Sequence, residues 1–127
     1  MFEQDYIIRQ IKECVATAMK LVFNIEIESY GSVMIQDKEK KAQADELLLK
    51  IDRGNIRDAI SELYAMVVED RTKDDLLIGL LFYSHICEKD DDFLDINNIN
   101  FSEIKDGMKY YFSQFGIPEV TDLFFFE

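Results

Sequence analysis

The sequence predicts an all-α protein, a single domain over residues 1–127 that folds as one bundle of about five helices. First, apolar residues recur three and four positions apart along most of the chain, which is the spacing of one face of an α-helix. Second, only one proline and five glycines occur, so long stretches lack helix breakers. Third, residues 47–63 read as a helical hairpin, in which one apolar stripe ends at Gly54 and another begins at Ile56.

The first expected helix spans residues 5–24. Its apolar residues cover an arc of roughly 160° on a helical wheel, so we expect it to contact at least two other helices. These residues are Ile7, Ile8, Ile11, Cys14, Val15, Ala18, Met19, Leu21 and Val22. The helical period is lost over residues 25–36, where we expect a loop packed by its own apolar side chains; a β-hairpin around Tyr30-Gly31 is the alternative.

The second and third helices form the predicted hairpin. Asp37 is the expected N-cap of a helix that runs to about Asp52. Gly54 supplies the left-handed residue that ends it, and Asn55 is the expected N-cap of a helix over 56–69. The residues expected to be buried are Leu47, Leu48 and Ile51 on the first of these helices, and Ile56, Ala59, Ile60, Leu63, Met66 and Val67 on the second.

A fourth helix over 73–88 begins at an expected capping box formed by Thr72 and Asp75. This helix is apolar nearly all round, so we expect it to lie at the centre of the bundle. Residues 88–100 carry a run of acidic and asparagine residues that breaks the pattern and predicts a polar linker.

A fifth helix is expected to begin at Ser102 with Glu103 and to end at Gly116, shortly before Pro118. Its buried face is expected to consist of Ile104, Met108, Tyr111 and Phe115.

Two stretches resemble known families. Asp5-Tyr6-Ile7-Ile8-Arg9-Gln10-Ile11 resembles the opening of a family of small all-helical bacterial proteins of similar length, whose function is uncharacterised. The second stretch resembles the turn and second helix of a tetratricopeptide repeat, at Gly54, Ile56, Ala59, Ile60 and Leu63. The first-helix positions depart from that repeat at Gln43, Glu46 and Lys50. The first resemblance assigns no functional residue, and the second implies one helix-turn-helix unit, without the stacked units that form ligand grooves.

Charge and cysteine usage narrow the classes of partner. With 26 acidic and 14 basic residues, the net charge of −12 argues against binding to nucleic acid or to an anionic membrane surface. No apolar run reaches the ~20 residues of a membrane span, and no basic segment precedes an apolar one near Met1, so we expect no secretory signal. Cys14 and Cys87 form no paired motif, and we expect reduced thiols in a cytoplasmic protein.

No catalytic, cofactor-binding or metal-ligating residue is predicted. His85 and Cys87 make the one pairing that resembles a catalytic or metal site, but residues two apart on a helix point about 200° from each other. The acidic run Asp90-Asp91-Asp92, with Glu88 and Asp95 nearby, lacks the glycine and the alternation of a calcium loop. We therefore expect no cofactor and no enzymatic activity.

The C-terminal apolar cluster consists of Leu123, Phe124, Phe125 and Phe126. We expect it to fold back and close the bundle; the alternative is an interaction site that seats in another subunit or protein. The function we expect is an interaction or regulatory domain that binds a protein partner or a second copy. Two alternatives stay open: an acidic mimic of nucleic acid that binds a basic protein, since residues 88–127 carry 10 acidic and 3 basic residues, and a metal-dependent enzyme that uses carboxylates from different helices.

Overall fold

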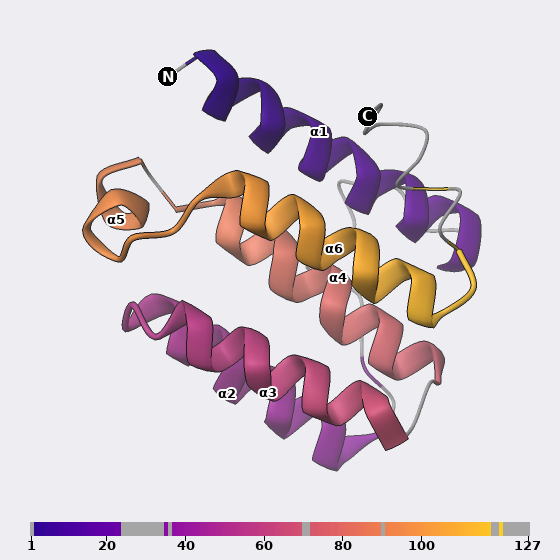
Figure 1. Ribbon diagram of the computed structural model, residues 1–127. Coiled ribbons are helices and arrows are strands. Elements are labelled where there is room, and N and C mark those ends of the chain that lie inside the picture. Colours follow the sequence, from indigo (N-terminus) through magenta and orange to yellow (C-terminus); the bar gives the residue numbers. More distant parts are fainter. Residues whose placement is uncertain are drawn as a thin grey trace.

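Helices make up most of the chain in the computed structural model, which describes residues 2–23, 35, 37–69, 72–89, 91–117 and 120 (Figure 1). No strand occurs among these residues, so the predicted all-α class is confirmed. The helices in chain order are α1 (Phe2–Ala18), its π-helical continuation η1 (Met19–Phe23), α2 (Lys38–Asp52), α3 (Ile56–Glu69), α4 (Lys73–Cys87), α5 (Asp91–Ile96) and α6 (Phe101–Gln114).

Residues at the helix ends determine where α2 and α3 begin and end. The Asp37 carboxylate caps α2 by accepting hydrogen bonds from the backbone N–H groups of Glu39 and Lys40, at 2.9 and 3.1 Å. Gly54 has a φ of +84°, the left-handed conformation that lets the chain leave α2 and enter α3 within three residues. Both helices lie where the sequence predicted them, and they pack against each other.

The fourth helix is the centre of the bundle, as its all-round apolar surface predicted. Helix α4 packs against α1, α2, α3 and α6, and Figure 1 shows α6 lying along it, with α1 on one side and the α2–α3 pair on the other. Its buried residues are Asp75, Leu76, Leu77, Ile78, Gly79, Leu80, Phe82, Tyr83, Ile86 and Cys87.

The prediction of an unbroken polar linker over 88–100 is wrong. Within that stretch Asp91–Ile96 form the short helix α5, because Leu94 is fully buried and anchors one helical turn in spite of the surrounding charge. Asn98, with a φ of +57°, ends the turn. The predicted start of α6 at Ser102 is also corrected. The side chain of Asn100 is the N-cap, accepting from the N–H of Ser102 at 2.7 Å.

Other predictions fall partly or wholly outside the described residues. The loop or hairpin expected over 25–36 lies outside the described residues, except for Ile35, which is buried. The C-terminal apolar cluster at 123–126 lies there entirely. Three of the four buried positions predicted for the fifth expected helix are confirmed, at Ile104, Met108 and Tyr111, whereas Phe115 is only partly buried against the core. In the part of the chain that the structure describes, no helix has the length and apolarity needed to cross a membrane.

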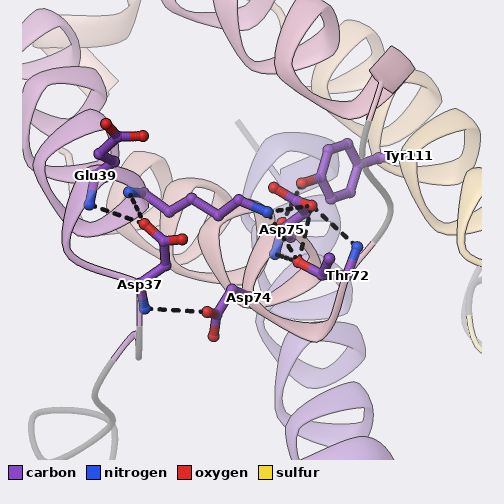
Figure 2. A network of polar contacts seen from close by, with 7 residues as sticks. Asp37, Glu39, Thr72, Asp74, Asp75 and Tyr111 are labelled. Atoms are coloured by element: carbon purple, nitrogen blue, oxygen red, sulfur yellow. Dashed lines mark hydrogen bonds and ion pairs between the residues drawn. The ribbon is translucent and has the colours of Figure 1, made fainter.

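The buried residue Asp75 joins α2 and α4 through its carboxylate and α6 through its backbone carbonyl (Figure 2). Asp75 is 2% exposed and accepts hydrogen bonds from the N–H of Thr72 at 3.0 Å and from the Thr72 hydroxyl at 2.9 Å. The ammonium group of Lys40 on α2 lies 3.0 Å from the same carboxylate oxygen. The Tyr111 hydroxyl on α6 donates to the backbone carbonyl of Asp75. The predicted capping box is confirmed, and it is also the point where three helices are tied together.

Helix α6 packs a tyrosine ring against α4 at a position where α4 has no side chain. A Cβ atom on Gly79 would overlap the ring of Tyr111, so the ring fills the space that the glycine leaves open. Tyr111 is buried and its hydroxyl reaches the carbonyl of Asp75, one turn earlier on α4. One aromatic residue therefore sets both the separation and the register of the two helices.

We expect Gly79→Ala to lower the free energy of unfolding by about 1–2 kcal/mol in urea denaturation. Overpacking a core costs ~1–3 kcal/mol, which outweighs the gain of up to ~1 kcal/mol in helix propensity. Gly107→Ala on α6 is the control, since the added Cβ there would overlap one terminal atom, the hydroxyl of the half-buried Tyr64, whose side chain can shift, and would lie at an ordinary contact distance from the Tyr83 hydroxyl. That variant is expected to stay within ~0.5 kcal/mol of the wild type, and equal losses in both variants would contradict the role given to Gly79.

Asp75→Ala is expected to destabilise the protein by about 3 kcal/mol, also measured in urea. Removing one partner of a buried ion pair costs ~3–5 kcal/mol, and the lower end applies because the Lys40 side chain is 16% exposed and can turn to solvent. Asp74→Ala is the matched control: Asp74 is the adjacent, partly exposed carboxylate, which accepts from the N–H of Asp37 at 3.2 Å. A loss below ~1 kcal/mol for Asp75→Ala would show that the junction contributes little.

Candidate functional site

A pocket of about 300 Å³ lies between α3, α4 and α6. Three different helices contribute to its wall, so the pocket exists only because of the way they pack. The residues that line it are Arg57, Ile60, Ser61 and Tyr64 of α3, Tyr83 of α4, and Glu103, Ile104 and Gly107 of α6.

The α3 wall follows the helical period. Positions 57, 60, 61 and 64 are spaced as neighbours on one face of a helix, and so are positions 103, 104 and 107 on α6. The sequence shows this spacing, but Arg57 and Ser61 are polar and appear simply as solvent-exposed. Sequence analysis therefore missed the pocket, since nothing in the chain marks those two stretches as facing each other.

Two tyrosine hydroxyls meet inside the pocket. The Oη atoms of Tyr64 and Tyr83 lie 3.4 Å apart, and Tyr83 is only 1% exposed. Burial raises the pKa of Tyr83 well above its ordinary value and raises the pKa of Tyr64 as well. Both hydroxyls therefore stay protonated at neutral pH, as hydrogen-bond donors and acceptors. Gly107 makes room for them, because a Cβ there would overlap the Tyr64 hydroxyl.

The two tyrosines belong to an aromatic cluster that connects the pocket to the core. The ring of Tyr64 lies 5.4 Å from that of the exposed Tyr110, and the ring of Tyr83 lies 6.1 Å from that of Tyr111. These are typical distances for favourable ring contacts. Tyr83 in the pocket wall thus contacts Tyr111, whose ring in turn packs against Gly79 of α4.

An ion pair spans the mouth of the pocket. The guanidinium group of Arg57 donates to both carboxylate oxygens of Glu103, at 2.7 and 3.1 Å, and to the carbonyl of Asn98 at 2.8 Å. The hydrogen bond from Arg57 lowers the pKa of Glu103, and the same bond raises the pKa of Arg57. The mouth is thus held by two compensating charges, and the pair joins α3 to α6 and to the turn after α5.

His85 and Cys87 diverge, as the helical spacing predicted. The imidazole of His85 contacts two carboxylates, Asp52 at 2.8 Å and Glu88 at 3.3 Å, and its side chain is 23% exposed. Cys87 is buried, and so is Cys14; both are free thiols. Burial raises the pKa of each thiol to about 12, so neither is an activated nucleophile.

The acidic run around residues 88–95 is the other group of side chains in the sequence that resembles a metal site. Among the residues that the structure describes, no three histidine, cysteine, aspartate or glutamate side chains come close enough to hold a metal ion. Asp90 lies outside those residues, as does the C-terminal apolar cluster at 123–126.

A family model matches residues 1–116 of the chain, and its description reads "Family of unknown function (DUF6483)". Searches of curated proteins and of solved structures found no match.

Acid is expected to weaken the fold in part through the ion pair at the mouth. Because Arg57 lowers the pKa of Glu103, the pair stabilises the protein above the ordinary pKa of a glutamate, and this contribution is lost as pH falls through the lowered value. The urea midpoint should therefore fall less between about pH 7 and about pH 3 in Glu103→Gln than in the wild type. The difference should be small, since both side chains are at least half exposed.

Glu13→Gln, at an exposed position on α1, is the control and should follow the wild-type profile. In every variant Asp52 also makes the protein less stable as the pH falls, because hydrogen bonds from Lys89 and then His85 lower the pKa of Asp52. Superimposable profiles for Glu103→Gln and the wild type would contradict a stabilising ion pair at the mouth.

Proposed function

We propose that this chain, which belongs to the DUF6483 family, is a non-catalytic binding domain that receives a side chain of a partner protein in the pocket between α3, α4 and α6. The pocket itself carries the proposal. Its volume of about 300 Å³ is at the low end of the ~300–1,000 Å³ of ligand sites, a size suited to one inserted side chain. Its walls combine two isoleucines with a few polar groups, which is how binding pockets combine affinity with orientation.

Binding fits the chemistry of the pocket better than catalysis does. A nucleophile needs a base within hydrogen-bond reach, whereas each hydroxyl at Tyr64 and Tyr83 faces the other and has a raised pKa. The carboxylate in the wall, Glu103, is engaged by Arg57 and has a lowered pKa, so it is a poor proton acceptor.

The net charge supports a basic partner. A charge of −12 speeds the approach of a positively charged surface and disfavours an acidic one. The neutral ion pair at the mouth leaves the pocket itself without excess charge, so the long-range attraction and the local recognition rest on different groups.

The resemblance of the α2–α3 hairpin to one tetratricopeptide unit also supports a binding function. Those repeats bind through grooves formed by stacked helix pairs. Here α3 supplies one wall of the pocket in a similar way, but α4 and α6 supply the others in place of a second repeat.

The proposal is tested by filling the pocket. Ser61 lines it from an exposed position on α3, so Ser61→Phe is expected to occupy the space without disturbing the core. Affinity purification from the native cell, quantified by mass spectrometry, should show at least one protein whose recovery falls about tenfold or more with this variant, which is the effect of losing one central anchor.

Ala42→Phe, which places the same side chain at an exposed position on α2, is the matched control and should retain that protein. Because the partner is expected to be basic, its recovery should also fall with added salt. Identical sets of proteins recovered with Ser61→Phe and Ala42→Phe would overturn the pocket as the binding site.

A further inference from the structure

We propose that the partner side chain selected by this pocket is a tyrosine, recognised through the one hydroxyl proton that Tyr64 and Tyr83 leave uncommitted. This inference rests on the proposed function and adds the chemistry of the occupant. It follows from the count of donors and acceptors in the pocket and from the shape and charge of its walls.

The two hydroxyls of Tyr64 and Tyr83 together carry one more donor than they use. Each tyrosine hydroxyl carries one proton and can accept two hydrogen bonds. The pair shares a single contact of 3.4 Å, and neither hydroxyl bonds any other residue that the structure describes. Whichever of the two donates to the other, one O–H remains available. A side chain that enters the pocket must therefore offer an acceptor, or it leaves a donor without a partner in a largely buried place.

This requirement removes most classes of side chain. Lysine, arginine and tryptophan have no acceptor, and aliphatic side chains and phenylalanine have no polar atom. Carboxylates carry acceptors, but the net charge of −12 on the whole chain disfavours the approach of an acidic side chain. Serine and threonine are too short to fill about 300 Å³. Methionine and cysteine offer only a sulfur atom, which is a weak acceptor. The side chains left with a strong acceptor are tyrosine, asparagine, glutamine and neutral histidine.

Among these, tyrosine matches the walls. Ile60 and Ile104 offer apolar surface, and the rings of Tyr64 and Tyr83 already belong to an aromatic cluster that an inserted ring would extend. A phenol also loses less rotational freedom on binding than a glutamine does, because tyrosine has only two χ angles. Its hydroxyl can accept the available proton and donate its own to the Ser61 hydroxyl, which lines the same pocket.

The test measures selectivity with small probes. N-acetyl-tyrosinamide, N-acetyl-phenylalaninamide and N-acetyl-glutaminamide are titrated into the full chain, and binding is followed by NMR at the methyl groups of Ile60 and Ile104. We expect the tyrosine probe to bind about fivefold more tightly than the phenylalanine probe, the factor that one net hydrogen bond contributes. It should also bind more tightly than the glutamine probe.

Three variants test the shared proton. Tyr64→Phe and Tyr83→Phe each remove one hydroxyl, but the remaining one no longer donates to its neighbour and still has a free proton. Each single variant should therefore keep the preference for the tyrosine probe, and the double variant should lose it. Tyr6→Phe, an exposed tyrosine on α1, is the control and should bind all probes as the wild type does.

The outcomes separate this inference from the proposed function. Methyl shifts with equal or tighter binding of the phenylalanine or glutamine probe would overturn tyrosine selection and leave the pocket as a binding site. A preference that persists in the double variant, or that vanishes in one single variant, would overturn recognition through a shared proton. If no probe shifts the methyl groups of Ile60 and Ile104 while Ser61→Phe still loses a partner in purification, tyrosine selection fails but the binding domain stands. If the partner is also retained, both fail.

Discussion

The contact between Tyr111 and Gly79 is the constraint on which the rest of the structure depends. Because Gly79 has no side chain, α6 can lie close to the central helix, and the ring of Tyr111 fills the space between them. The Tyr111 hydroxyl donates to the carbonyl of Asp75, which sets how far α6 is shifted along α4. A side chain at position 79 would overlap this ring, so the position of α6, which carries three residues of the pocket wall, depends on the glycine.

The pocket is a consequence of that packing. Helix α3 is held to α2 by the short turn at Gly54, and α6 is held to α4 through Tyr111, so α3 and α6 face each other across Tyr83. Their side chains reach each other at the mouth, where Arg57 pairs with Glu103, and inside, where Tyr64 approaches Gly107. The space between these two contacts is the pocket, and the buried Tyr83 lines it from α4.

Two of the ion pairs that join different helices, Lys40–Asp75 and Arg57–Glu103, have different physical roles. The Lys40–Asp75 pair is nearly buried and is joined by the hydroxyl and N–H of Thr72, so it orders the start of two helices at once. The Arg57–Glu103 pair is half exposed, and water and salt weaken it. A weakly held pair at the mouth is compatible with the entry of a side chain, whereas a deeply buried pair there would oppose it.

Sequence alone determined where most helices begin and end, because those signals act within a few residues: apolar spacing, the cap at Asp37, the capping box at Thr72 and the glycine at Gly54. The sequence did not predict α5. The buried side chain of Leu94 stabilises a helical turn there, within an acidic stretch whose composition indicates a linker. Only the tertiary structure brought the hydroxyls of Tyr64 and Tyr83 together beside Gly107 and gave Gly79 its role. Those positions lie far apart in the chain, and their meeting depends on how the helices cross, which the local pattern of no single helix records.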